Sequence, residues 1–200
     1  MTGTPGQSKP AQGGAASGPT RWGPVFLDRD GVINRRRVGD WVRTPEQLEL
    51  LPGALDAIAR LTRAGRSPVV VTNQSGIGRG TMTRADVDQV NAYLTARVER
   101  AGGRLRGILV CPHAPNDACA CRKPGIAMFE QAATAWGLDL TRATMIGDAA
   151  SDVEAARRAG FANALLVTDP VEPYPASAPA PDREFASLAE AVDWLLSKPM

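Results

Sequence analysis

Two carboxylates separated by one residue are the clearest chemical feature of this sequence. Asp28 and Asp30 stand in the segment Asp28-Arg29-Asp30-Gly31, directly after the apolar run 24–27. Alternate residues of an extended chain leave it on the same side, so we expect the two carboxylates together and Arg29 pointing away. A hard divalent cation such as Mg²⁺ would relieve their repulsion and leave one of them free to act as a nucleophile. Such a pair is also typical of a solvated acidic turn, so it needs support from other segments.

Three further polar segments follow apolar runs that read as strands. Thr72 opens the Gly-rich stretch 72–80, whose hydroxyl and backbone N–H groups could hold phosphate oxygens. Arg122-Lys123 is a cationic pair that could neutralise a phosphoryl group, and Asp148 offers another carboxylate to Mg²⁺. Each segment alone has an ordinary structural interpretation. Their order on consecutive strand ends indicates one site for a phosphoryl group.

The cysteines form a second constellation. The chain has three Cys and one His, all within Cys111-x-His113-x5-Cys119-x-Cys121. Three thiolates and an imidazole complete a tetrahedral Zn²⁺ site with no open position for water, which predicts a structural zinc that staples this loop and positions the next two residues. Free cysteines beside a surface histidine are the less favoured alternative. The odd cysteine count fits poorly with a disulfide framework and favours a cytoplasmic protein.

Apolar runs that alternate with amphipathic stretches predict an α/β fold. The pattern is that of a Rossmann-like three-layer open parallel sheet with helices on both faces and ligands beyond the carboxyl ends of the strands. We expect a disordered tail over residues 1–20, which are rich in Gly, Ser, Ala, Pro and Gln, and a single domain over 21–200 without a large cap domain. The expected strands cover 24–27, 68–71, 108–110, 144–146 and 164–167, and the expected helices cover 52–64, 83–101, 125–136, 152–159 and 187–196.

Composition excludes several classes of partner. A formal charge of +2 argues against a large nucleic-acid surface. The sequence contains no run of about 18 apolar residues, so no membrane span is indicated. We therefore expect neither nucleic acid nor membrane as a partner, and we expect a monomer.

The combined motifs resemble the haloacid dehalogenase superfamily of phosphohydrolases over residues 25–167. The resemblance implies that Asp28 is the nucleophile and that Asp30 is the general acid and then the general base. Thr72 and Lys123 would stabilise the phosphoryl oxygens. Asp28 and Asp148 would bind Mg²⁺ through their side chains, and Asp30 through its carbonyl oxygen. Asp152 would support the loop through hydrogen bonds.

The zinc loop narrows the resemblance to the branch of the heptose bisphosphate phosphatases and histidinol-phosphate phosphatases. The stretch 72–80 and the segment 30–34 look like the heptose enzymes, whereas the histidinol branch usually has an acidic residue at the position of Ser75. The short spacer of five residues between His113 and Cys119 argues against this choice, because it also occurs in the histidinol-phosphate phosphatases. Ala149 departs from the branch, which often has a basic residue there that touches the phosphate.

The resemblance therefore favours removal of the 7-phosphate of D-glycero-D-manno-heptose 1,7-bisphosphate, a small phosphorylated sugar, through an aspartyl-phosphate. Histidinol-phosphate phosphatase is the alternative, and a polynucleotide 3′-phosphatase and a zinc-stapled binding module are weaker ones. The triple arginine 35–37 is typical of a solvated loop, but beside this site it could equally hold a second phosphate. The candidate substrate-binding residues are Asn73, Gln74, Ser75, Arg122 and Arg36.

Overall fold

One parallel sheet organises the chain. The computed structural model describes residues 23–168 and 173–198, so the tail expected over 1–20 lies outside the described residues. Six strands follow the order β3-β2-β1-β4-β5-β6, and every neighbouring pair is parallel. The strands are β1 (Val25–Leu27), β2 (Val69–Asn73), β3 (Gly107–Cys111), β4 (Thr144–Gly147), β5 (Asn163–Val167) and β6 (Arg183–Phe185). The five expected strands are confirmed, and β6 is an edge strand that the sequence pattern did not indicate.

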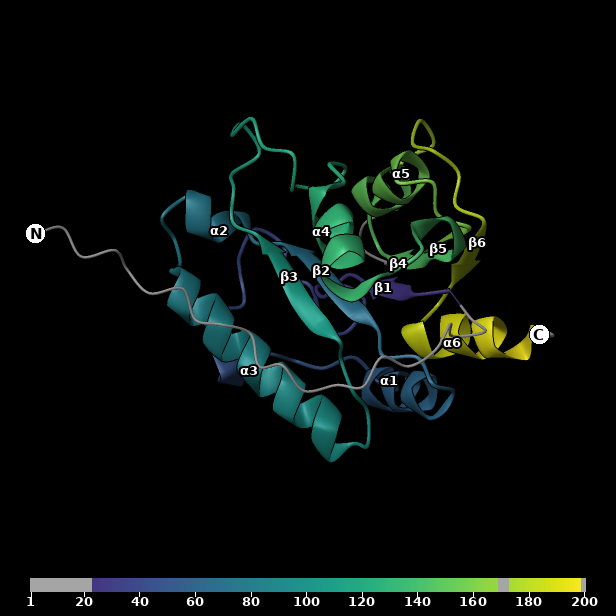
Figure 1. The fold of residues 1–200 in the computed structure, drawn as a ribbon. Coiled ribbons are helices and arrows are strands. Elements are labelled where there is room, and N and C mark those ends of the chain that lie inside the picture. The colour runs from purple at the N-terminus through teal and green to yellow at the C-terminus, as the bar shows by residue number, and fades with distance from the viewer. Residues whose placement is uncertain (1–22, 169–172, 199–200) are drawn as a thin grey trace, which may run out of the picture.

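Helices cover both faces of this sheet (Figure 1). Three helices lie on one face and two on the other, which confirms the expected three-layer α/β architecture. The first group is α1 (Ala54–Arg63), α3 (Arg84–Arg100) and α6 (Leu188–Ser197), and the second is α4 (Ala127–Trp136) and α5 (Ala150–Arg158). Short turns complete the fold, namely η1 (Pro45–Gln47), α2 (Ser75–Gly78) and η2 (Leu140–Arg142).

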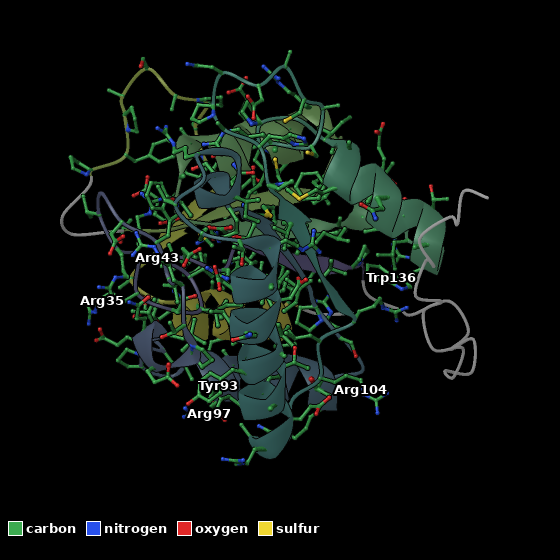
Figure 2. The ribbon with its side chains drawn as sticks, turned by 90° about the vertical axis from the view of Figure 1, so that its left-hand side faces the viewer. Arg35, Arg43, Tyr93, Arg97, Arg104 and Trp136 are labelled. Atoms are coloured by element: carbon green, nitrogen blue, oxygen red, sulfur yellow. The ribbon has the colours of Figure 1, made fainter. Side chains whose placement is uncertain are left out.

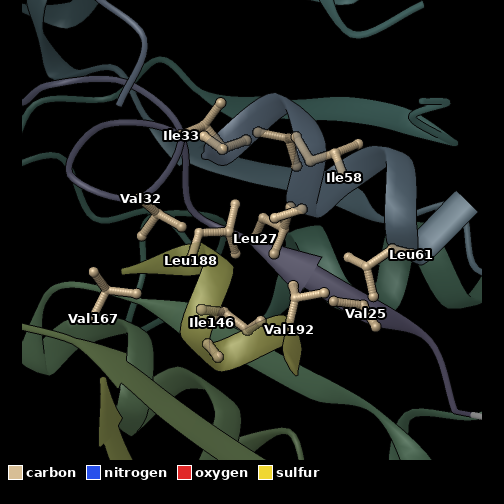
Figure 3. Packing of buried hydrophobic residues seen from close by; sticks show 14 of the residues in the cluster. Val25, Leu27, Val32, Ile33, Ile58, Leu61, Ile146, Val167, Leu188 and Val192 are labelled. Atoms are coloured by element: carbon tan, nitrogen blue, oxygen red, sulfur yellow. The ribbon is translucent and has the colours of Figure 1, made fainter. Parts of the chain in front are cut away.

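The central strand β1 is held from both sides because its side chains alternate. Val25 and Leu27 join the apolar cluster under α1, α3 and α6, which Figure 3 shows from close by. Phe26 points to the opposite face, where its ring lies 5.2 Å from that of Phe129. Full burial of such a side chain contributes about 1.5–3 kcal/mol. Packing on both faces therefore fixes the position of the end of β1, and with it the position of the residues that follow directly.

Helix α3 carries a polar residue on its buried face. Thr83 begins the helix with a capping box: its hydroxyl accepts from the Asp86 amide at 3.1 Å, and the Asp86 carboxylate accepts from the Thr83 amide at 2.7 Å. Figure 2 looks onto the outer face of the helix, and at its side Arg97 donates to the Tyr93 hydroxyl at 2.9 Å. The inner face is apolar except for Asn91, which is 8% exposed. A buried amide needs a partner, and that partner lies beside the candidate site.

No second domain covers the carboxyl edge of the sheet in the part of the chain that the structure describes. The connection from β1 to α1 holds only loop, isolated bridges and the short helix η1. Among the described helices, none combines the length and apolarity that a membrane span requires.

Candidate active site

Asp28 lies at the end of β1 in a buried group of charges. The Lys123 ammonium donates to Asp28 Oδ1 at 2.7 Å and to the Val71 carbonyl oxygen at 2.8 Å, and it lies 2.6 Å from Asp152 Oδ1. Burial raises the pKa of Asp28 to about 6, although Lys123 opposes this shift. Burial acts to lower the pKa of Lys123, but the two carboxylates outweigh it, so that pKa is raised. Lys123 is therefore a permanent cation beside the expected nucleophile.

Asp148 adds a third carboxylate at the end of β4. Oxygen atoms of Asp28, Asp148 and Asp152 lie within 4.8 Å of one another. Burial and repulsion by Asp28 and Asp152 raise the pKa of Asp148 to about 8. Among the described residues, no donor makes a hydrogen bond to either Asp148 oxygen, although Arg36 Nη2 forms an ion pair with Oδ2 at 2.9 Å. Three buried carboxylates lie together here, and Asp148 Oδ1 has neither a hydrogen bond nor an ion pair among the described residues. Such oxygens are the ligands that a hard divalent cation prefers, so these residues fit Mg²⁺.

Two glycines allow this crowding. A Cβ atom at Gly31, whose φ is +93°, would lie 1.9 Å from Asp148 Oδ2. A Cβ atom at Gly147 would lie 2.3 Å from the Asp152 Cβ atom. Any side chain at either position would push a carboxylate out of the site.

Asp152 supports the loop, as the resemblance implied. Its Oδ2 accepts from the backbone amides of Asp148 at 3.2 Å and Ala149 at 3.0 Å. These bonds fix the turn between β4 and α5 and leave Oδ1 for the ion pair with Lys123.

Asp30 has donors on both carboxylate oxygens. Asn34 Nδ2 donates to Oδ1 at 2.8 Å, and Gln74 Nε2 donates to Oδ2 at 2.7 Å. Arg29 Nη2 lies between the oxygens, at 3.2 Å from Oδ1 and 3.0 Å from Oδ2. The expectation that Arg29 points away is therefore wrong in one respect. Its side chain leaves toward the α3 face, but the guanidinium returns to Asp30.

The residues at the carboxyl end of β2 and just after it have two different sets of partners. Thr72 is 1% exposed and its hydroxyl accepts from Gln74 Nε2 at 2.9 Å. Asn73 exchanges two bonds with Lys123: its Nδ2 donates to the Lys123 carbonyl oxygen at 3.2 Å, and its Oδ1 accepts from the Lys123 amide at 3.0 Å. The side chains expected to touch substrate at 73 and 74 thus already hold the catalytic groups in place. Ser75 begins α2 and is not among the described residues that line the cavity.

A cavity of about 530 Å³ opens over these groups. Its described lining includes the catalytic candidates Asp28, Asp30, Thr72 and Lys123. Ala149 also lines it, at the position where the related branch often has a positively charged residue. The arginines on its wall are Arg36, Arg37, Arg79 and Arg122. This cationic wall suits a substrate with more than one phosphate.

The arginines differ in how far they are committed to protein partners. Arg35 is 61% exposed and pairs with Glu49 at 2.9 Å on the surface (Figure 2), and Arg37 lies 3.5 Å from Asp40. Arg122 Nη1 is buried and has no hydrogen-bond partner among the described residues. Sequence reasoning missed Arg79. The signal was its place in Gly78-Arg79-Gly80, a cation between two glycines in the predicted phosphate loop.

The cysteine cluster is assembled as expected. Cys121 Sγ lies 3.2 Å from Cys111 Sγ and 3.1 Å from His113 Nδ1, and Cys119 Sγ lies 3.9 Å from Cys111 Sγ. A tetrahedron of sulfur ligands at about 2.3 Å from zinc has edges of roughly 3.8 Å, so the four ligands fit Zn²⁺. Because these four ligands would leave no open position on the zinc, the cluster needs no role in the chemistry of the phosphoryl site.

The loop of the cluster also contacts the phosphate loop. The Gln74 amide donates to the Cys111 carbonyl oxygen and the Gly78 amide donates to the Pro112 carbonyl oxygen, both at 2.8 Å. A Cβ atom at Gly78 would lie 2.6 Å from the Ala114 amide nitrogen. The same loop therefore carries Lys123 on one side of the site and supports the stretch 74–78 on the other.

This parallel sheet, with its carboxylates and lysine at the carboxyl edge, is that of the haloacid dehalogenase-like hydrolases. A family model described as HAD-hydrolase-like matches residues 120–191. The D-glycero-beta-D-manno-heptose-1,7-bisphosphate 7-phosphatase of Bordetella bronchiseptica is 40% identical over 144 residues, which are 72% of this chain and 80% of that protein. The chain belongs to the family of the heptose-1,7-bisphosphate 7-phosphatases, and the resemblance read from the motifs is confirmed.

A relative from another organism and a solved structure give similar matches. A D-glycero-alpha-D-manno-heptose-1,7-bisphosphate 7-phosphatase of Mycobacterium bovis is 39% identical over 147 residues, covering 69% of this chain and 73% of its own. The crystal structure of the D,D-heptose 1,7-bisphosphate phosphatase of B. bronchiseptica, complexed with magnesium and phosphate, superposes with a TM-score of 0.79 at 34% identity. That match covers 88% of this chain and 99% of the other.

Proposed function

We propose that this chain hydrolyses the 7-phosphate of D-glycero-D-manno-heptose 1,7-bisphosphate through an aspartyl-phosphate on Asp28. One observation carries the proposal: the Asp28 carboxylate lies 2.7 Å from the buried Lys123 ammonium, and it lines a cavity whose wall carries several arginines. The activity named for the relatives supports the heptose substrate over histidinol phosphate. A cytoplasmic location, a monomeric state and a single domain over 21–200 stay predictions.

In the first half of the reaction, an Asp28 carboxylate oxygen attacks phosphorus and the bond from phosphorus to the sugar oxygen breaks. Asp30 gives its proton to the departing oxygen. Lys123 and the Thr72 hydroxyl balance the charge on the phosphoryl oxygens. Asp28 and Asp148, with the Asp30 carbonyl, would hold Mg²⁺, which supplies further charge neutralisation when bound; the magnesium named for the B. bronchiseptica structure supports this choice of metal.

In the second half, Asp30 takes a proton from water as the water attacks the aspartyl-phosphate. Inorganic phosphate leaves and Asp28 returns as a carboxylate. Zn²⁺ in the cysteine cluster would hold the loop that carries Arg122 and Lys123, and would take no part in either step.

The distal phosphate requires cations away from Asp28. We assign this role to Arg122, whose Nη1 is buried without a hydrogen-bond partner among the described residues, together with Arg79. Arg36, the other arginine expected to bind substrate, forms its ion pair with Asp148 Oδ2 at 2.9 Å and so lies at the catalytic end of the cavity. Loss of one charge-assisted contact costs about 1.5–3 kcal/mol, or roughly 10–150-fold in kcat/KM. Arg122→Ala should therefore lose that much on the heptose bisphosphate and far less on p-nitrophenyl phosphate.

The test is a comparison of kcat/KM on both anomers of the heptose bisphosphate, histidinol phosphate and a 3′-phosphorylated oligonucleotide. The matched control is Arg35→Ala, because Arg35 pairs with Glu49 outside the cavity and should leave every substrate unchanged. A wild type that prefers histidinol phosphate would overturn the substrate assignment. Equal losses of Arg122→Ala on bisphosphate and monophosphate would remove Arg122 from the distal site.

A further inference from the structure

A fully buried arginine stands between the two catalytic aspartates in sequence. Arg29 is 0% exposed and is the largest fully buried residue in the part of the chain that the structure describes. Transfer of a charged group out of water costs several kcal/mol unless it is paired and hydrogen-bonded. Its two Nη atoms make the hydrogen bonds of this guanidinium, because Nε is buried without a partner among the described residues.

Those two atoms join Asp30 to helix α3. Nη2 contacts both Asp30 oxygens, and Nη1 donates to Asn91 Oδ1 at 3.0 Å. Arg29 and Asn91 are 62 residues apart in the sequence, so helix packing alone brings them together. The strand alternation that sends Leu27 to the α3 face also sends Arg29 there. The polar residue on the inner face of α3 thus has its partner in the segment that carries the catalytic acid.

The contacts leave the Asp30 carboxylate little rotational freedom. Each of its oxygens accepts one amide bond, from Asn34 or Gln74, and Arg29 contacts both oxygens. Rotation of the carboxylate about its bond to Cβ would break these contacts together. Arg29 is the charged member of this set, and Asn91 fixes it at the far end.

We propose that Arg29, anchored by Asn91, is a positioning residue that holds the Asp30 carboxylate in the orientation required for proton transfer. The inference rests on the proposed role of Asp30 as acid and base. A purely structural ion pair would affect stability and reduce activity on all substrates alike. A positioning residue instead affects the substrates whose leaving group needs the proton.

The test varies the leaving group. Arg29→Met, Asn91→Ala and Asp30→Asn are compared with wild type on a simple alkyl phosphate and on p-nitrophenyl phosphate, both monophosphates, so the result does not depend on the heptose. General acid catalysis contributes about 10²–10⁴-fold, and misplacement of an acid that is still present should lose part of this, roughly 10–100-fold in kcat/KM on the alkyl phosphate. The loss on the aryl phosphate, whose leaving group departs without a proton, should be at least several-fold smaller.

Two further variants separate positioning from folding. Asn91→Asp keeps an acceptor for Arg29 and should restore the alkyl phosphate activity that Asn91→Ala loses. Val98 is buried in the same helix about two turns beyond Asn91, so Val98→Ala should lower the melting temperature without any dependence on leaving group.

Equal losses on both substrates in Arg29→Met and Asn91→Ala, or no rescue by Asn91→Asp, would overturn the positioning role. If Asp30→Asn itself showed no dependence on leaving group, the proposed acid would be wrong, which is a different result from failure of Arg29. A wild type without activity on any phosphate monoester would refute the proposed function before this inference is reached.

Discussion

Replacement of Lys123 by methionine probes the charge balance beneath the cavity. Lys123 is 3% exposed, and its ammonium lies within 2.7 Å of Asp28 and 2.6 Å of Asp152. Methionine keeps an unbranched apolar side chain but leaves two buried carboxylates without their cation. Removal of one partner of a buried ion pair costs about 3–5 kcal/mol. At about 2–4 °C per kcal/mol for a domain of this size, the melting temperature should fall by about 6–20 °C.

A double-mutant cycle with Asp152→Asn identifies the cause of this loss. In Lys123→Met/Asp152→Asn, one carboxylate charge leaves together with the cation, so the double variant should be more stable than the sum of the single losses predicts. The coupling should be about 0.5–3 kcal/mol, measured by urea unfolding without added metal. The control is Arg84→Met, which breaks an exposed pair with Asp88 and should change stability by less than about 0.5 kcal/mol.

Additive losses would refute the reasoning, because they would mean that Lys123 and Asp152 do not share the ion pair. A melting temperature of Lys123→Met equal to that of wild type would refute it more directly. Turnover is a separate readout, since this variant also lacks the cation that faces the phosphoryl group.

Three other predictions follow from the site. Asp28→Asn keeps the shape but removes the anionic oxygen that must attack phosphorus, so turnover should fall by several orders of magnitude; near-normal activity would exclude the aspartyl-phosphate. The purified protein should contain about one Zn²⁺ per chain, and Cys119→Ser should lower metal content and melting temperature together, whereas zinc-free protein of unchanged stability would contradict the staple. Burial raises the pKa of Asp148 from 3.8 to about 8 and that of Asp28 from 3.8 to about 6. These two carboxyl groups therefore bind more protons in the folded metal-free protein than in the unfolded chain, and stability should decrease as pH rises from about 5 to about 8, above the range in which carboxyl groups of lowered pKa act in the opposite direction. Melting curves across this range should show the decrease, and it should become smaller with Mg²⁺ or in Asp148→Asn; a metal-free protein that gains stability over the same range would contradict the shifts.

The sequence predicted the fold well where a segment is long and buried on both sides. The apolar runs that became β2, β4 and β5 are bounded by polar turns, and the Thr83 capping box marked the start of α3. The edge strand β6 gave no such signal. It has three residues, and its first two are exposed and charged, so neither alternation nor apolar content distinguishes it from a loop.

The part of the site that lies at strand ends was predictable, because parallel strands bring their carboxyl ends to the same edge of a sheet. That rule placed Asp28, Thr72 and Asp148 at one edge and supplied Lys123 from the neighbouring loop. It could not reveal the contact of Arg29 with Asn91, because that contact depends on how α3 packs across the sheet. It also could not show that the side chain of Asn73 is occupied by the backbone of Lys123.

The open carboxyl edge has a consequence for the fate of the covalent intermediate. Within the described residues no second domain closes over the cavity of about 530 Å³, so an aspartyl-phosphate formed there would remain accessible to bulk solvent throughout its lifetime. Water would then compete with any small alcohol in solution for the same phosphorus atom. In concentrated glycerol, part of each turnover should yield glycerol phosphate in place of inorganic phosphate, in proportion to the alcohol present. The same openness that would admit a large sugar bisphosphate would thus also admit small alcohols as phosphoryl acceptors.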